Sequence, residues 1–325
     1  MNHHQSLREF TRRDFLVMMA AAGASLPFTA IERFGTETMK AQNEKRRIHV
    51  FSKHLQWLDY SAMAETIAAS GFDGVDLTVR PGGHVLPERV QDDLPRAVEA
   101  VRKAGLNVDM ITTANDNGRE AQTEPILKTA SKLGVKYYRM AWIDYDDALG
   151  IIDNLEALKP RFRDLAAMNE RYQIHGAYQN HAGVKVGAPV WDLWHLLKEL
   201  DPRWLGCQYD VRHATVEGGN SWELGFKLIS SHIKTTVIKD FKWTQHEGKW
   251  RAETCSVGEG MVDFKKYFAL VKAQRIDGPI SMHFEYPIFE TSEENSSVSA
   301  KTQKVIAIMQ KDLRTLRAMM KEAGL

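Results

Sequence analysis

Eight short β-rich runs, each followed by a helix-like segment, predict an α/β chain folded as a single (β/α)8 TIM barrel. The alternation of strand and helix patterns calls for a parallel sheet. Eight such units over residues 46–325 fit a closed barrel better than an open doubly wound sheet. No G-x-G-x-x-G motif follows the first run, which argues against a dinucleotide-binding fold. No Pro-, Gly- or Ser-rich linker divides 46–325, so we expect one domain there.

The strand–helix units follow one another with short turns between them. Gly71, Gly105 and Gly134 end the first three helices, as glycine commonly does. The strands are predicted at 48–51, 74–79, 107–111, 135–142, 172–178, 204–209, 233–238 and 280–284. The helices that follow them are predicted at 60–69, 94–104, 124–133, 148–171, 190–200, 222–230, 262–273 and 301–321.

The first 45 residues have a different composition from the rest of the chain. Arg12 and Arg13 precede a weakly apolar run, which resembles a twin-arginine export signal. The run is roughly 15 residues long, against the ~20 that a membrane-spanning helix needs. We therefore expect a signal peptide and linker over 1–45, a periplasmic or otherwise exported protein, and no stable membrane insertion after signal removal. An N-terminal amphipathic helix is the alternative.

The charge balance of the chain argues against nucleic acid as a partner. Lys and Arg total 43, and Asp and Glu total 42. A balanced surface lacks the basic footprint that nucleic acid or an acidic membrane attracts. A small molecule is therefore the expected partner, and the sequence leaves homo-oligomerisation open.

Polar side chains follow four consecutive predicted strands in the second half of the chain. Gln179 ends the fifth strand, Asp210 the sixth, Lys239 the seventh and Glu285 the last. In a (β/α)8 barrel the C-terminal strand ends form one rim, and active-site groups lie there. Oxygen and imidazole ligands on neighbouring strands can enclose a divalent cation with open positions for substrate. A charged residue such as Glu285 at the end of a buried strand is hard to explain by packing alone.

Several motifs give the chain a family resemblance over nearly all of 46–325. They are the segment 71–77, Asp210-x-x-His213, Lys239-Asp240, the segment 258–264 and Glu285. Together they resemble the xylose-isomerase-like TIM barrels, a group of sugar (phosphate) isomerases and epimerases that also includes inosose dehydratases and a class of AP endonucleases. The resemblance implies a Mn²⁺, Co²⁺ or Mg²⁺ site built from a glutamate, an aspartate, a histidine and a glutamate on strands five to eight.

Two positions depart from the ligand pattern that the resemblance implies. Asp210 and Glu285 match it, whereas Gln179 stands where the first glutamate is expected. Val237 stands at the histidine position, although a slip of one or two residues brings Lys239 there. Glutamine can ligate a metal through its amide oxygen but cannot take up a proton. A simple epimerase that uses two carboxylates is therefore disfavoured.

We assign roles to the residues around this rim. Glu285, His213 and Lys239 are the predicted catalytic residues, and Gln179, Asp210 and Glu285 are the predicted metal ligands. The predicted substrate-binding residues are Arg80, His84, Trp142, His181 and His54. His213 would bind or protonate a substrate oxygen, and His181 and Lys239 are further candidate acids or bases. Purely structural alternatives are a salt bridge from Glu285 to Lys239 or Arg139, and helix capping by Asp210.

The predicted function is a metal-dependent sugar isomerase or epimerase that acts through an enediolate next to a carbonyl group. Loss or addition of a β-hydroxyl from the same intermediate gives the alternative, a hydratase or dehydratase (a lyase) on a keto-sugar such as a 3-keto-glucose derivative. A non-catalytic periplasmic sugar-binding protein is a further alternative, favoured by Val237 and Gln179. A phosphodiester nuclease would need a richer metal cluster and a basic groove, which the sequence does not show.

Overall fold

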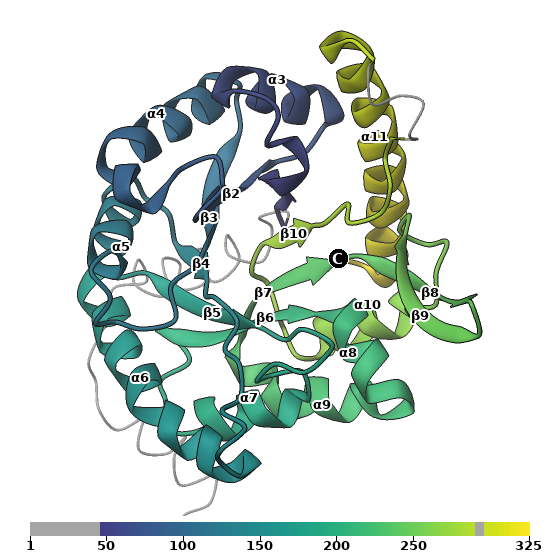
Figure 1. Cartoon of the computed structure of the whole chain (residues 1–325). Coiled ribbons are helices and arrows are strands. Elements are labelled where there is room, and N and C mark those ends of the chain that lie inside the picture. Colours follow the sequence, from purple (N-terminus) through teal and green to yellow (C-terminus); the bar gives the residue numbers. More distant parts are fainter. Residues whose placement is uncertain (1–45, 290–295) are drawn as a thin grey trace, which may run out of the picture. The chain divides into compact units, whose positions relative to one another are not determined.

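Eight parallel strands close into a barrel with helices around its outside (Figure 1). A computed structural model of the chain describes residues 46–289 and 296–325, so the predicted export signal lies outside the described residues. Around the barrel the strand order is β1-β10-β7-β6-β5-β4-β3-β2, with parallel pairing throughout. The predicted (β/α)8 TIM barrel is confirmed.

The barrel strands are short and buried, as the β-rich runs predicted. They are β1 (Ile48–Phe51), β2 (Gly74–Val79), β3 (Asn107–Thr113), β4 (Tyr137–Arg139), β5 (His175–Gln179), β6 (Leu205–Asp210), β7 (Ile233–Ile238) and β10 (Ile280–Met282). The fourth strand is shorter than the predicted 135–142, because the backbone N–H of Ala141 already bonds to the carbonyl of Asn115 in the loop after β3. The fifth begins later than predicted, because α6 continues to Tyr172 and Gln173 then takes a left-handed conformation.

The helices pack their apolar faces on the outside of the barrel. They are α3 (Tyr60–Ser70), α4 (Val90–Lys103), α5 (Thr123–Lys132), α6 (Ile151–Tyr172), α7 (Val190–Leu197), α8 (Val211–Gly218), α9 (Trp222–Ile229), α10 (Phe264–Ala273) and α11 (Val298–Ala323), with 3-10 turns η1 (Ser52–Leu55), η2 (Pro87–Arg89), η3 (Gly219–Ser221) and η4 (Ser230–His232). None of the helices within 46–289 and 296–325 is long and apolar enough to span a bilayer. The short helix α8, directly after β6, was not predicted.

A second unpredicted element is an antiparallel hairpin that follows β7. It consists of β8 (Asp240–His246) and β9 (Lys249–Cys255), which pair only with each other. In Figure 1 the hairpin projects from the barrel beside α10. Its residues are largely exposed and carry many charges, so it contributes little to the barrel core.

Asp240 fixes the loop that follows this hairpin. Its carboxylate accepts hydrogen bonds from the backbone N–H groups of Phe241 (2.9 Å), Gly258 (3.0 Å), Gly260 (2.9 Å) and Val262 (3.1 Å). Gly258 has φ +87°, and a Cβ atom on Gly260 would lie 2.1 Å from Asp240 Oδ1. The glycines of segment 258–264 therefore let the backbone wrap the carboxylate. The segment supports the residue next to Lys239, as expected for a turn that shapes the loop.

We expect Asp240→Ala to lower the free energy of unfolding by roughly 3 kcal/mol or more, because it leaves several buried N–H groups without an acceptor. Urea denaturation measures the change. Glu259→Ala is the matched control: this exposed carboxylate in the same loop pairs with Lys311, and such surface pairs contribute about 1 kcal/mol or less. Equal losses in the two variants would contradict the assigned role of Asp240.

Candidate active site

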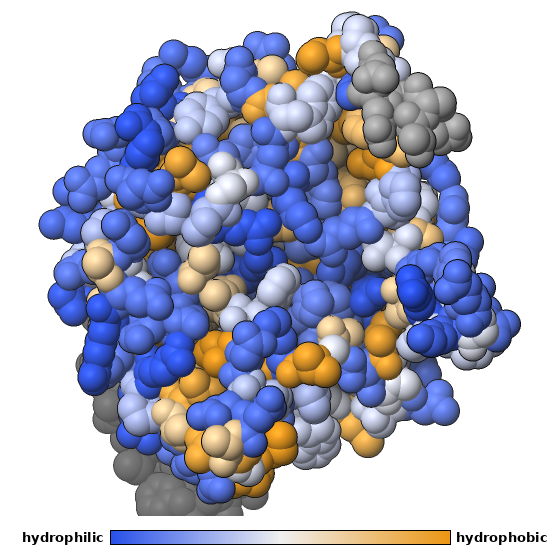
Figure 2. All heavy atoms as spheres, viewed as in Figure 1, coloured by the Kyte–Doolittle hydropathy of each residue, from blue (hydrophilic) through white to orange (hydrophobic). Residues whose placement is uncertain are grey.

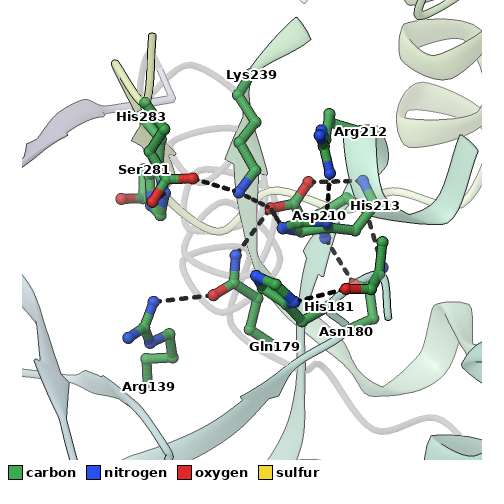
Figure 3. A network of polar contacts seen from close by, with 12 residues as sticks. Arg139, Gln179, Asn180, His181, Asp210, Arg212, His213, Lys239, Ser281 and His283 are labelled. Atoms are coloured by element: carbon green, nitrogen blue, oxygen red, sulfur yellow. Dashed lines mark hydrogen bonds and ion pairs between the residues drawn. The ribbon is translucent and has the colours of Figure 1, made fainter. Parts of the chain in front are cut away.

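The ammonium group of Lys239 lies between two carboxylates at the C-terminal ends of β6, β7 and β10 (Figure 3). Its Nζ atom is 2.8 Å from Glu285 Oε2 and 3.2 Å from Asp210 Oδ2. The Lys239 and Asp210 side chains are buried, whereas 27% of the Glu285 side chain is exposed. Asp210 and Glu285 therefore converge on one cation, and that cation is the ammonium of Lys239.

Glu285 is held in its ionised form by its surroundings. Burial raises the pKa of its carboxyl, but the charge and hydrogen bond of Lys239, with smaller contributions from His283 and Lys53, outweigh burial and hold the pKa well below its usual value. Lys53 Nζ lies 3.6 Å and His283 Nδ1 4.0 Å from the second oxygen, Oε1. The salt bridge to Lys239, the structural alternative for this residue, is thus present, and Glu285 still reaches solvent.

The side-chain amide of Gln179 is held in one orientation by Arg139 and Asp210. Its amide oxygen accepts a hydrogen bond from Arg139 Nη1 (2.9 Å), and its amide nitrogen donates to Asp210 Oδ2 (2.8 Å). A guanidinium only donates and a carboxylate only accepts, so this orientation of the amide is fixed. The predicted metal-ligating oxygen of Gln179 therefore points to Arg139, away from the carboxylates.

The donor set does not fit a divalent cation. The amide oxygen of Gln179 is occupied, Val237 offers no donor, and Lys239 brings a positive charge between the two carboxylates. Within the described ranges, no group of three or more His, Cys, Asp or Glu side chains is placed to hold a metal ion. Gln179, Asp210 and Glu285 were predicted to ligate a metal. In the structure the two carboxylates pair with the ammonium of Lys239, and no open coordination site lies between them.

Asp210 also caps a helix, in agreement with its structural alternative. Its Oδ1 accepts a hydrogen bond from the backbone N–H of His213 (3.1 Å), at the start of α8. The backbone of Asp210 is held by Asn180, whose amide accepts from its N–H (2.8 Å) and donates to its carbonyl (3.0 Å). Capping and the contact with Lys239 use different oxygens, so one residue does both.

His181 and His213, which follow β5 and β6, differ in which ring nitrogen carries the proton. Arg212 Nη1 donates to His213 Nδ1 (3.0 Å), so in the neutral ring the proton is on Nε2, 3.6 Å from Asp210 Oδ2. His181 Nδ1 donates to the carbonyl of Ala182 (2.9 Å), which leaves a lone pair on its Nε2. Burial, and then the charge of Lys239, lower the pKa of both rings. His213 therefore offers an N–H donor and His181 a basic nitrogen, with ring centroids 4.0 Å apart.

Two of the other predicted substrate-binding residues are half-buried: Arg80 directly follows β2, and Trp142 follows β4 by three residues. The Trp142 ring lies 4.3 Å from that of His181, and the Arg80 guanidinium lies 5.5 Å from the Phe51 ring, with no side-chain hydrogen bond from Arg80 among the described residues. Hydrophilic side chains gather over the centre of this face of the barrel (Figure 2).

His84 uses both ring nitrogens, and His54 its Nε2 atom, in hydrogen bonds within the protein. His54 Nε2 accepts from the backbone N–H of Phe284 (3.0 Å), and burial lowers the pKa of His54 to about 4. His84 bonds to the hydroxyls of Ser52 and Thr78 through Nδ1 and to the carbonyl of Leu55 through Nε2. These hydrogen bonds hold η1 against β2 and the segment after β10, and the predicted substrate-binding roles of His54 and His84 stay predictions.

The sequence did not identify several residues of the network. It indicated Arg139 only as an ion-pair partner, yet Arg139 lies buried between Phe51 and Trp142 and orients Gln179. Arg212 sets the tautomer of His213. His283 stacks on Phe51 with a centroid distance of 4.3 Å. The nearness of Arg212 and His283 to Asp210 and Glu285 in sequence was a signal, but the partners of these residues lie on other strands.

Comparisons with known proteins agree with this fold. A sequence model of the family described as Xylose isomerase-like TIM barrel matches residues 64–325. Nothing among curated protein sequences matches the chain. Similar solved structures include a xylose isomerase domain protein from Planctomyces limnophilus (14% identity, 86% of this chain and 99% of that chain, TM-score 0.63). A second is a 3-keto-D-glucoside 4-epimerase from E. coli (13% identity, 81% of this chain and 99% of that chain, TM-score 0.60). A third is the probable 3-DHS dehydratase from Bacillus anthracis (14% identity, 83% of this chain and 98% of that chain, TM-score 0.61).

We expect Lys239→Met to destabilise the protein by roughly 3–5 kcal/mol near neutral pH, because it leaves the fully buried carboxylate of Asp210, and the partly exposed carboxylate of Glu285, without their cation. Since the folded-state pKa of Glu285 is lowered, its pairing in the wild type stabilises the fold above the unfolded-state pKa of about 4.3 and is lost only as the pH falls through the folded-state value. In the variant, burial raises the pKa of Glu285, and protonation relieves the buried charge.

The stability gap between wild type and variant should therefore narrow from about pH 7 to about pH 4. Chemical denaturation at both pH values measures it. Lys53→Met is the matched control, because its side chain is 47% exposed and its contact with Glu285 is longer; we expect a loss of about 1 kcal/mol or less. A gap that widens on acidification would contradict the assigned pairing of Lys239 with Glu285.

Proposed function

This chain belongs to the xylose isomerase-like TIM barrel family, and we propose that it is an enzyme that moves a proton next to the carbonyl group of a sugar or keto-sugar. The reaction class is that of a sugar isomerase or epimerase. The observation that carries the proposal is the convergence of Asp210, Lys239 and Glu285 at the strand ends, with His181 and His213 beside them. Only Glu285 among the two carboxylates is partly exposed, so it is the group that meets substrate.

In this proposal Glu285 removes the proton from the carbon next to the carbonyl. A carboxylate whose pKa is held low is a weak base, so the negative charge that develops on the substrate oxygen has to be stabilised. The positive charges of Lys239 and of the half-buried Arg80 lower the energy of that oxygen, while His213, whose side chain is only 4% exposed, keeps its Nε2–H group beside Asp210. His181 carries a free lone pair just after β5, and β5 is separated from β10 by two strands of the barrel. Protonation of the opposite face by His181, after its Nε2 has taken up a proton from water and while Glu285 gives its own proton to water, would change the configuration. Return of the proton by Glu285 would preserve it.

A hydratase or dehydratase acting on a keto-sugar, such as a 3-keto-glucose derivative, is the second candidate. It is favoured by Gln179, which removes the carboxylate that a two-carboxylate epimerase would use. After proton removal, the carboxylic acid of Glu285 can return that proton to a departing β-hydroxyl, which leaves as water. The names of two structures with this fold, a 3-keto-D-glucoside 4-epimerase and a probable 3-DHS dehydratase, support keeping both reactions.

We also propose that the protein works outside the cytoplasm, on the basis of Arg12 and Arg13 and the apolar run after them. Fusion of residues 1–45 to a reporter that is active only after export tests this. Export that is lost when both arginines are replaced by lysine supports the proposal. Export that continues unchanged contradicts it.

Solvent isotope exchange tests the chemistry directly. The purified protein is incubated in ²H₂O with a panel of sugars and 3-keto-sugars, and label and products are followed by NMR and mass spectrometry. Deuterium at a carbon beside the carbonyl shows enolisation. Retention of all oxygen atoms then indicates isomerisation or epimerisation, and loss or gain of water indicates the lyase reaction. Binding of a panel member with no exchange at all would indicate a sugar-binding protein.

We expect Glu285→Gln to reduce exchange and turnover by roughly 10²–10⁴-fold, because the amide cannot accept the proton. Rates are compared with those of the wild type on the same substrate. Glu253→Gln is the control: it removes a half-exposed carboxylate that pairs with His246 within the β8–β9 hairpin, and it should leave the rates unchanged. Activity retained in Glu285→Gln would remove Glu285 from the mechanism.

A further inference from the structure

We propose that the ammonium group of Lys239 takes the place of a divalent cation in this barrel, and that the protein works without a bound metal. The inference rests on the proposed function, since it names the group that supplies positive charge during proton removal. It concerns the residues that the family resemblance would assign to a metal centre, which here surround a side chain of the chain itself.

The position of Lys239 is the first argument. Its Nζ atom lies 2.8 Å from one carboxylate and 3.2 Å from the other, so it occupies the space in which both could share a cation. The strand order explains why: β7 lies between β6 and β10, and Lys239 directly follows Ile238 at the end of β7. A metal ion at this point would have to displace an ammonium of the same sign.

The second argument is that the oxygens around Lys239 are already used. Asp210 Oδ1 caps α8, and its Oδ2 accepts a hydrogen bond from Gln179 and forms an ion pair with Lys239. The Gln179 oxygen faces Arg139, a buried guanidinium that also contacts the rings of Phe51 and Trp142. Entry of a metal would break these hydrogen bonds and leave buried donors unpaired, which is costly.

The third argument is charge balance. Three carboxylates and one divalent ion, the set that the resemblance implies, carry a net charge of −1. Asp210, Glu285 and the ammonium of Lys239 also carry −1, because Gln179 is neutral. Glutamine at 179 and lysine at 239 therefore compensate each other, and neither substitution alone would keep this balance.

Lys239 acts in this proposal as a positioning residue. Its side chain is only 2% exposed, so the substrate meets Glu285 and not the ammonium. The ammonium fixes the direction of Glu285 and provides a permanent positive charge beneath the reacting atoms. Chelators therefore have nothing to remove.

Metal content gives the first test, read without any substrate. Untagged protein purified from medium supplemented with Mn²⁺ and Co²⁺ should contain well below one equivalent of either ion by inductively coupled plasma mass spectrometry. Titration with Mn²⁺ or Co²⁺ should give no stoichiometric binding in calorimetry. One tightly held equivalent that is lost in Asp210→Asn would overturn the proposal.

The reverse substitution gives the second test. The double variant Gln179→Glu with Lys239→His should gain Mn²⁺ or Co²⁺ binding near one equivalent, and its melting temperature should rise when the ion is added. Its matched control, Gln179→Glu with Lys239→Met, keeps the carboxylates but lacks the imidazole and should bind the ions more weakly. Wild-type protein that binds as strongly as the double variant would contradict the proposal. Circular dichroism confirms that each variant is folded.

Activity separates this inference from the proposed function. Exchange that continues unchanged in EDTA supports both. Exchange that requires added Mn²⁺ or Co²⁺ supports the proposed function and overturns the role of Lys239. If no sugar undergoes exchange and the protein binds no metal, the proposed function is refuted. The metal-binding measurements then still support the replacement of a metal ion by Lys239.

Discussion

The salt bridge of Lys239 with Asp210 and Glu285 is the interaction on which the rest of the site depends. It joins the ends of three strands, and all of its polar atoms except part of Glu285 are withdrawn from water. Buried charges are tolerated only when they are paired and hydrogen-bonded. Three charged side chains at the ends of neighbouring strands therefore constrain one another, and the neighbours around them must complete the hydrogen bonds that remain.

Those neighbours form a chain of donors and acceptors in which each orientation determines the next. Arg139 can only donate, so it turns the Gln179 oxygen toward itself and the Gln179 nitrogen toward Asp210. Arg212 likewise determines which nitrogen of His213 carries the proton. Groups held in this way need little reorganisation when charge develops nearby, which is the condition for strong electrostatic stabilisation. The comparison structures share the fold at 13–14% identity, so these specific contacts rest on this chain alone.

The sequence was sufficient for the barrel because strand and helix periodicity are local properties, and for Asp210 and Glu285 because a carboxylate at the end of a buried strand is conspicuous. It was insufficient where side-chain partners are distant in the chain. His84 bonds to Ser52, 32 residues away, and His54 to Phe284, 230 residues away, and no local pattern reveals this. For Asp210 and Glu285 the structural and functional alternatives are compatible. Asp210 caps α8 and Glu285 forms a salt bridge with Lys239, and both residues still lie in the candidate active site. The β8–β9 hairpin was missed because its strands are largely exposed and rich in charged residues, so they lack the buried β-rich pattern of the barrel strands. Helix α8 follows β6 without a turn signal between them.

Lys239 and Asp240 are consecutive residues with separate tasks, one among the strand-end carboxylates and the other inside the turn formed by 258–262. A peptide unit is rigid, so the anchoring of Asp240 is transmitted to the backbone of Lys239 across a single bond. Loop residues that never approach a ligand thereby acquire control over the reacting groups. In a mutational survey, the glycines at 258 and 260 would register as determinants of turnover as well as of folding, and homologues with longer insertions at this turn would need another anchor to keep the lysine in register.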